Sequence, residues 1–82
     1  MVAVRTFRLV ITSVTGAQFD GDAISATLPG SAGEMTILAH HEPLVSTLRK
    51  GSIKVRTEQG SQEIKVEKGV VECSSNRVTI LV

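Results

Sequence analysis

The sequence has few aromatic residues and a single cysteine. Phe7 and Phe19 are its only aromatic side chains, and it has no Trp or Tyr. Proteins that bind single-stranded nucleic acids stack bases on aromatic rings, so this composition argues against nucleic acid as a partner. The lone Cys73 excludes an internal disulfide and a zinc site built from several cysteines. We expect Cys73 to be a buried, inert thiol in a reducing compartment.

The sequence also lacks an excess of charge and a long apolar run. Nine Lys and Arg residues face eight Asp and Glu residues, which gives a net charge of +1. Such a balance produces a weak field that does not recruit a polyanion. The start of the chain, broken by charge at Arg8, predicts neither a signal peptide nor a transmembrane span. We therefore expect one soluble domain over residues 1–82.

Apolar residues recur at every second position in several short stretches, which is the period of half-buried strands. Residues 58–61 and 74–76 are rich in turn formers, and Gly60 is free to adopt a positive φ. The segment from Leu38 to Arg49 lacks clean alternation and contains Pro43, which predicts a loop or an edge crossing. The pattern as a whole predicts an all-β sandwich or barrel. The alternating apolar positions include Phe7, Leu9, Ile11, Ile24, Ala26, Leu28, Ile53, Val55, Ile64, Val66, Val78, Ile80 and Val82.

Only His40, His41 and Glu42 resemble a metal site or an acid–base pair. Adjacent residues of an extended segment point to opposite sides, so the two histidines do not converge on one ion. The chain offers no third histidine, whereas a catalytic zinc needs three protein ligands. We predict no catalytic residues, no metal and no cofactor, and we interpret the histidines as turn residues or partner contacts.

Two further stretches have features of binding sites. Pro29 to Gly33 is rich in glycine, but it lacks the Lys and Ser/Thr ending of a phosphate-binding loop, so a tight turn explains it better. Arg49, Lys50, Lys54 and Arg56 form a modest basic cluster around a hairpin. The alternation of Ile53 and Val55 favours a solvated strand face over a surface for an acidic partner.

Two neighbouring stretches carry a resemblance to a known family. Gly33-Glu34-Met35-Thr36-Ile37-Leu38, which we interpret as a loop, is followed by His41-Glu42-Pro43-Leu44. This order closely resembles the N-terminal domain of the epsilon subunit of F-type ATP synthases. The resemblance continues upstream through Phe19-x-Gly21 and Pro29-Gly30, and downstream to Val78-Thr79-Ile80-Leu81. It covers nearly the whole chain.

The resemblance implies a flattened antiparallel β-sandwich of two sheets with about ten short strands. It further implies a non-catalytic subunit of the rotating central stalk, which docks on the gamma subunit and the c ring and couples proton or sodium flow to ATP synthesis. The residues carried over are Ser31, Gly33, Glu34 and Met35 toward the c ring, and Ser13, His41, Glu42, Pro43 and Leu44 toward the gamma subunit.

The resemblance also places the protein at the cytoplasmic face of a bacterial inner membrane, which it would touch only through the complex. Most family members continue into a C-terminal helical hairpin that restrains ATP hydrolysis and in some of them binds ATP. This sequence stops at Val82. If Val82 is the natural C-terminus, the resemblance implies a coupling subunit with neither the helical brake nor a bound nucleotide; if the sequence is a fragment, the hairpin belongs to the part that was removed.

Two other functions stay open at the level of the sequence. An unrelated small β-sandwich acting as an adaptor or ligand-binding module predicts a self-contained pocket. A minimal His-dependent hydrolase predicts activity that is lost when His40 or His41 is replaced. The rotor subunit predicts instead a stable complex with the gamma subunit.

Overall fold

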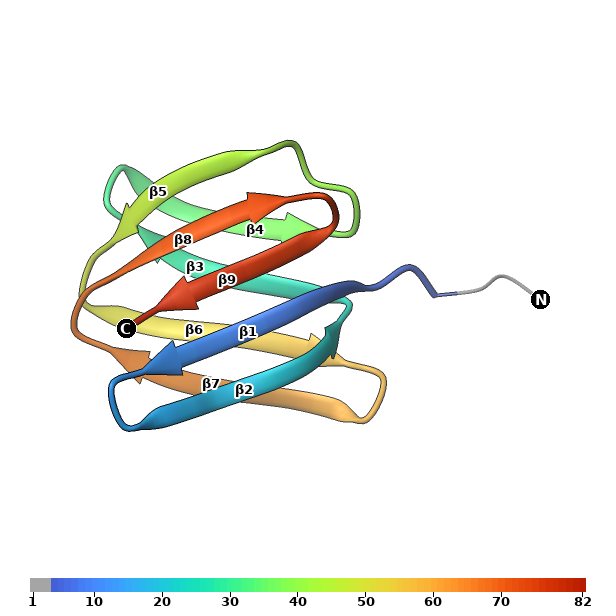
Figure 1. Cartoon of the computed structure of the whole chain (residues 1–82), viewed down its shortest axis with the longest axis horizontal. Helices are drawn as coiled ribbons and strands as arrows, with labels where there is room; N and C mark the ends of the chain where they lie inside the picture. Colours follow the sequence, from blue (N-terminus) through green and yellow to red (C-terminus); the bar gives the residue numbers. More distant parts are fainter. Residues whose placement is uncertain (1–3) are drawn as a thin grey trace.

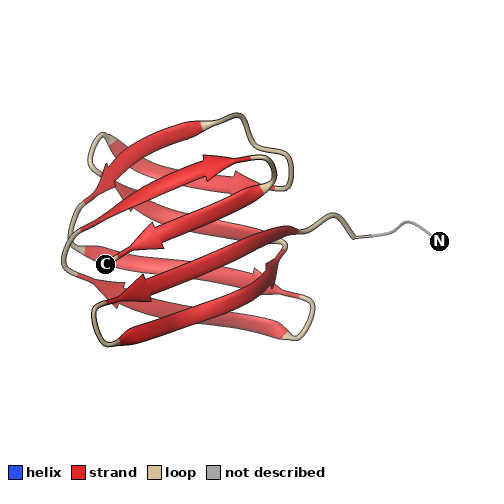
Figure 2. Cartoon of the chain, in the orientation of Figure 1, coloured by secondary structure: helices blue, strands red, loops and turns tan. Residues whose placement is uncertain are grey.

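The computed structural model describes residues 4–82 and contains nine β-strands joined by short turns (Figure 1). No helix occurs in these residues, so the predicted all-β class is confirmed (Figure 2). The single-domain prediction begins at residue 1, and residues 1–3 lie outside the described part. The strands are β1 (Phe7–Ser13), β2 (Gly16–Ala23), β3 (Ser25–Gly30), β4 (Gly33–Leu38), β5 (Leu44–Leu48), β6 (Gly51–Thr57), β7 (Gly60–Val66), β8 (Gly69–Ser74) and β9 (Arg77–Leu81).

The strands form two stacked layers, as the predicted β-sandwich requires. One layer has the order β2-β1-β9-β8-β5, and the other consists of β7, β6, β3 and β4. The two layers are continuous because β5 also pairs with β3, through the single residue pair Gly30 and Leu48. Neighbouring strands run antiparallel with one exception, since β1 and β9 pair in parallel. We call the outer surface of the first layer the front face, because it faces the viewer in Figure 1, and that of the second layer the back face.

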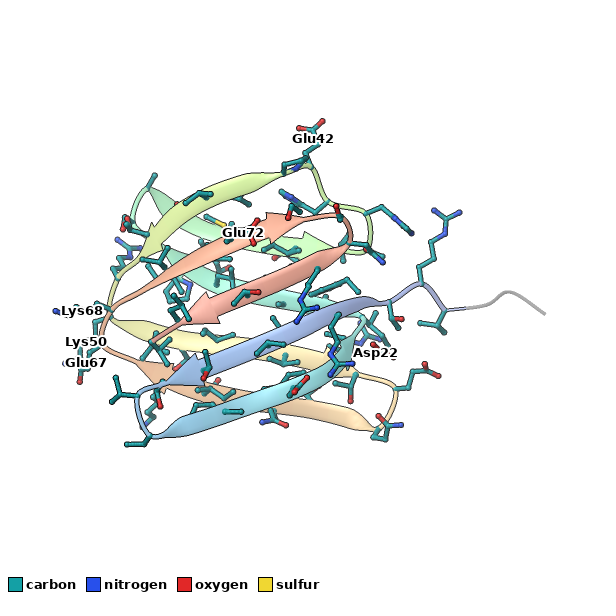
Figure 3. The ribbon with its side chains drawn as sticks, in the orientation of Figure 1. Asp22, Glu42, Lys50, Glu67, Lys68 and Glu72 are labelled. Carbon is teal, nitrogen blue, oxygen red and sulfur yellow. The ribbon has the colours of Figure 1, made fainter. Side chains whose placement is uncertain are left out.

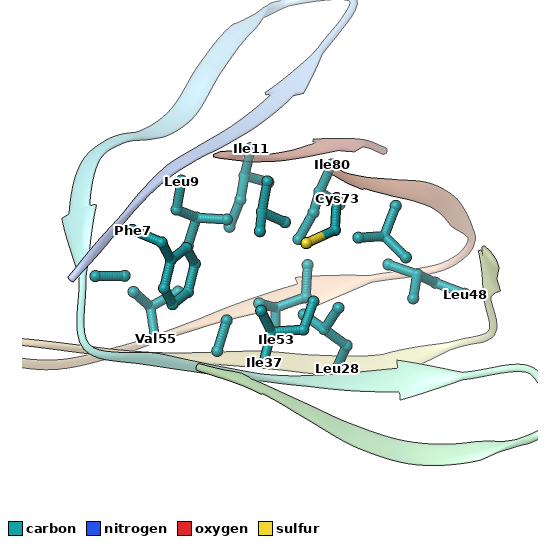
Figure 4. Close-up of a cluster of buried hydrophobic side chains, with 14 of the residues drawn as sticks. Phe7, Leu9, Ile11, Leu28, Ile37, Leu48, Ile53, Val55, Cys73 and Ile80 are labelled. Atoms are coloured by element: carbon teal, nitrogen blue, oxygen red, sulfur yellow. The ribbon is translucent and has the colours of Figure 1, made fainter. Parts of the chain in front are cut away.

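The core lies between the two layers and is entirely apolar within residues 4–82 (Figure 4). Each strand sends alternate side chains inward, so the period of two seen in the sequence becomes one buried face per strand. Burial of each large side chain contributes roughly 1.5–3 kcal/mol to stability. The buried hydrophobic residues are Phe7, Leu9, Ile11, Ala23, Ala26, Leu28, Ile37, Leu48, Ile53, Val55, Val66, Val71, Cys73, Val78 and Ile80.

Turn chemistry at Gly60 agrees with the expectation from the sequence. Strands β6 and β7 are joined by Glu58 and Gln59, and Gly60 follows with a φ of 135°. An L side chain at this φ would be strained, so glycine permits the hairpin to close after two residues. Gly33 has the same role after the β3–β4 turn, where its φ is 139°.

The turn between β8 and β9 holds three segments of the chain together. Ser75 and Asn76 both have positive φ, as a two-residue hairpin turn of this kind requires. The side-chain amide of Asn76 donates to the carbonyl oxygen of Thr6 at 3.0 Å, and its Oδ1 accepts from the backbone N–H of His40 at 2.7 Å. Asn76 therefore ties the start of β1 and the β4–β5 loop to the β8–β9 turn.

Two expectations about local structure were wrong. Within Leu38 to Arg49 only residues 39–43 and Arg49 lie outside strands, because Leu38 ends β4 and Leu44 to Leu48 form strand β5, which pairs with β8. Gly33 to Leu38, interpreted as a loop, is strand β4 and pairs with β3 along its whole length. In both strands an apolar residue faces solvent, Val45 in β5 and Leu38 in β4, and this obscures the alternation.

The Asn76 contacts lead to a stability prediction. Asn76→Ala removes two side-chain hydrogen bonds. It also leaves Ala in a left-handed conformation that Asn tolerates better. We therefore expect a loss of roughly 2–3 kcal/mol in the free energy of unfolding. Urea denaturation measures it. Ser75→Gly is the matched control, because it relieves the neighbouring positive φ and removes no such bond. Equal stability of Asn76→Ala and the parent chain would contradict the assigned role.

Candidate docking surfaces

The connections between strands gather at two opposite ends of the sandwich (Figure 1). The Ser31 end carries the turns at residues 14–15, 31–32, 49–50 and 67–68. The His41 end carries the connections at residues 24, 39–43, 58–59 and 75–76. Lys50, Glu67 and Lys68 project from the first end, whereas Glu42 projects from the loop at the second (Figure 3). Any partner of this domain meets either one of these ends or one of the two outer faces.

The residues predicted to face the c ring lie together at the Ser31 end. The backbone N–H of Ser31 donates to the carbonyl oxygen of Thr47 at 3.0 Å, and its hydroxyl lies 2.7 Å from the Thr47 hydroxyl. These bonds fix the tip of the β3–β4 hairpin against β5. Glu34 points into solvent from the start of β4, while Met35 packs partly against the core. The hairpin thus presents a carboxylate from a rigid support.

The hydroxyl of Ser13, predicted to face the gamma subunit, organises the β1–β2 turn. Its Oγ lies 2.9 Å from the Thr15 hydroxyl and accepts from the backbone N–H of Thr15 at 3.3 Å. Gln18 also donates to the same oxygen at 3.3 Å. Ser13 is half-buried and lies at the Ser31 end, beside the fully exposed tip residue Val14.

The other residues predicted to face the gamma subunit lie at the His41 end. The backbone N–H of His41 donates to the carbonyl oxygen of Leu38 at 3.2 Å, and its Nδ1 lies 2.7 Å from the carbonyl oxygen of Glu42. Glu42 and Pro43 are exposed, and half-buried Leu44 begins β5. The structure therefore brings His41, Glu42, Pro43 and Leu44 together and places Ser13 at the opposite end.

The front face joins these two separated positions and exposes apolar side chains. Ser13 belongs to β1 and Leu44 to β5, and both strands lie in the front layer. Val45, Val70 and Leu81 are exposed by 73%, 40% and 54%. Val70 pairs directly with Leu81, and next to them a groove of about 400 Å³ is lined mainly by carbon atoms of Leu48, Val70 and Val82. Exposed apolar side chains that pair across neighbouring strands, as Val70 and Leu81 do, are typical of docking surfaces.

The pattern of the sequence contains a signal for this patch. Val70 precedes the core residue Val71, and Leu81 follows the core residue Ile80. Because successive residues of a strand point to opposite faces, one member of each apolar pair must face outward. Adjacent apolar residues on neighbouring strands therefore predict an apolar outer patch as well as a core.

Within residues 4–82, no three side chains of His, Cys, Asp or Glu gather in a way that could hold a metal ion. Nor does this part of the chain contain a helix long and apolar enough to cross a membrane. The two ends and the two outer faces of the described residues are therefore the surfaces considered for docking.

Taken together, the two stacked layers, the two anchored loops and the exposed apolar side chains of the front face define a small β-sandwich domain. The chain belongs to the family of the ATP synthase delta/epsilon chain beta-sandwich domain, whose family model matches residues 6–82. This confirms the resemblance drawn from the Gly33 to Leu44 region.

Curated relatives and solved structures agree with this assignment. The ATP synthase epsilon chain of Bordetella petrii is 42% identical over 77 residues, covering 93% of this chain and 55% of the relative. That of Francisella tularensis subsp. tularensis is 43% identical over 72 residues, covering 88% and 50%. The chain thus spans about half the length of the curated relatives it matches.

Two solved structures share the fold. A chain in the Euglena gracilis mitochondrial ATP synthase, in a structure of OSCP, F1 and c ring, matches with a TM-score of 0.86 at 22% identity, covering all of this chain and 52% of that one. A chain in the central stalk and c ring of the Tetrahymena thermophila enzyme matches with a TM-score of 0.80 at 15% identity, covering 99% and 66%.

The buried thiol behind the His41 loop leads to a prediction about pH. Cys73 is only 2% exposed, and its Sγ lies 3.9 Å from the carbonyl oxygen of His41. Burial, together with the nearby Glu72 carboxylate, raises the pKa of this thiol. The folded state therefore retains a proton that the unfolded state releases above its thiol pKa of about 8.5, so stability falls as the pH rises beyond that value.

We expect this loss to be at most about 1.4 kcal/mol per pH unit, the ceiling for one proton. Urea denaturation at pH 8 and pH 10 measures it, with Cys73→Val as the matched variant that keeps the side-chain volume and removes the titrating group. The parent chain should lose more stability than the variant over this interval, and parallel losses would contradict the prediction.

Proposed function

We propose that this chain is a central-stalk subunit of an F-type ATP synthase, docked on the gamma subunit and the c ring. It joins rotor parts and couples proton or sodium flow to ATP synthesis, and it takes no part in the chemistry. The match of residues 6–82 to the family model is the observation that carries the proposal. The rotor binds at the cytoplasmic face of a bacterial inner membrane, so the chain is peripheral to that membrane.

The separation of the predicted gamma contacts supports docking across the front face. Ser13 and His41 lie at opposite ends, so one partner that reaches both must cover the strands between them. Those strands expose Val45, Val70 and Leu81. Burial of apolar area is the main source of affinity at stable interfaces, so this face supplies what a permanent partner needs.

The c ring then meets the Ser31 end. A rotor part that transmits torque needs a rigid contact, and the hydrogen bonds from Ser31 to Thr47 anchor the β3–β4 hairpin to β5 of the front layer. Glu34 offers a carboxylate there for the polar loops of the c subunits. Ser13 at the same end places the gamma and c-ring contacts next to each other.

The front face can be tested with one charged substitution. Val45→Lys introduces an ammonium group opposite Glu72. The Glu72 carboxylate can pair with this charge in the free chain, so the chain stays folded. The ammonium group must be desolvated, however, when the gamma subunit covers it. We expect at least a tenfold weaker complex with the purified gamma subunit from the same organism, equivalent to about 1.4 kcal/mol, measured by calorimetry. Thr36→Lys in β4 of the back layer is the matched control, since Thr36 is exposed and lies outside both the front face and the His41 end.

Equal effects of the two substitutions would exclude the front face as the gamma contact. If the parent chain itself formed no complex with the gamma subunit, the central-stalk proposal would be wrong, and the adaptor alternative would take its place.

The contact with the c ring can be tested separately in the reconstituted ATP synthase. A photo-crosslinking residue in place of Glu34 should yield a covalent product with a c subunit, because the β3–β4 hairpin faces the ring. The same residue in place of Glu58, an exposed carboxylate at the His41 end, should yield none. A c-subunit product from Glu58 alone would mean the opposite orientation. Products from both positions would contradict a specific contact of the Ser31 end with the ring.

A further inference from the structure

The back face carries a groove that the proposed contacts leave free. It has a volume of about 370 Å³ and lies across β3, β6 and β7. Its lining is more polar than that of the groove beside Val70, and it contains two cationic side chains. The residues whose side chains line it are Ser25, Thr27, Lys54, Arg56, Ser61 and Glu63.

The register of the sheet arranges these side chains in two rows. Arg56 pairs with Ser25 on one side and with Ser61 on the other. Lys54 pairs with Thr27 and with Glu63. The two cations belong to one strand and are two residues apart, so they project from the same face about 7 Å apart. Their flexible side chains can converge on one small group placed between them.

The polar atoms around Arg56 are available to a ligand. The only ion pair within residues 4–82 joins Arg8 to Asp20, on the other layer, so neither Lys54 nor Arg56 is neutralised by a carboxylate within 4 Å. Thr27 shares a hydrogen bond with Thr36 at 3.2 Å. The hydroxyls of Ser25 and Ser61 make no hydrogen bond with the described residues. Arg56 thus stands between two free hydroxyl donors.

We propose that this groove binds the phosphate group of a small soluble molecule, with Arg56 as its main ligand. A guanidinium flanked by hydroxyls matches the several acceptor oxygens of a tetrahedral dianion. Lys54 supplies a second positive charge, partly offset by Glu63 across the β6–β7 pair. An extended acidic segment fits less well, because it would run past the carboxylates of Glu63 and Glu58.

The test is a titration of the 82-residue chain with inorganic phosphate at constant ionic strength, followed by amide NMR shifts. The largest shifts should occur at Ser25, Arg56 and Ser61. Arg56→Gln should weaken binding at least tenfold, because it removes the charge-assisted hydrogen bonds to the phosphate oxygens. Glu63→Gln should tighten binding by roughly threefold, because it removes a like charge from the groove. Arg77→Gln, which removes an equal charge from the front layer, should have no effect.

Three outcomes would overturn the proposal. Arg77→Gln could weaken binding as much as Arg56→Gln, or the shifts could spread equally over Arg49, Lys50 and Lys68, and either result would mean diffuse attraction to a basic surface. A short poly-glutamate peptide could bind to the same amides more tightly than phosphate, which would assign the groove to an acidic protein segment. The proposal is independent of the central-stalk function, because gamma and c-ring binding are measured at other surfaces.

Discussion

Everything in this domain depends on closing two apolar sheet faces against each other within a short chain. The core of residues 4–82 contains no buried polar side chain, so no internal salt bridge or polar network selects the arrangement. Specificity comes instead from the strand register, from turns that need glycine or asparagine, and from the Asn76 amide that joins three segments. A domain of this size buries only roughly 60% of its unfolded surface, so each of these small terms is a large share of the net stability.

The same construction explains why the surfaces differ. Each layer packs one face against the core, so the side chains on its outer face can vary without disturbing the core. On the front layer the outward positions of β5, β8 and β9 include Val45, Val70 and Leu81, whereas on the back layer those of β6 are Lys54 and Arg56. A single sandwich can therefore offer an apolar surface for a permanent partner and a polar groove for a small anion.

The sequence predicts strands well where one face is buried and the other is polar. That condition holds for β1, β3, β6 and β9, and the alternation of apolar residues predicts these strands. It fails in β5, where exposed Val45 stands beside half-buried Ser46. The parallel pairing of β1 with β9 and the reach of Asn76 to His40 depend on residues far apart in the chain, which no local pattern encodes. Resemblance identified the candidate contacts, but only the fold reveals that Ser13 and His41 lie at opposite ends.

The parallel pairing of β1 and β9 has a consequence for synthesis. Strand β9 lies between β1 and β8, so the front sheet stays incomplete until residues 77–81 have been made. The β1–β2 hairpin leaves the ribosome before β9 does. One edge of β1 therefore stays unpaired while translation adds the later residues at about 5–20 per second. Contacts this distant in the chain slow folding, so the front sheet closes later than the local hairpins.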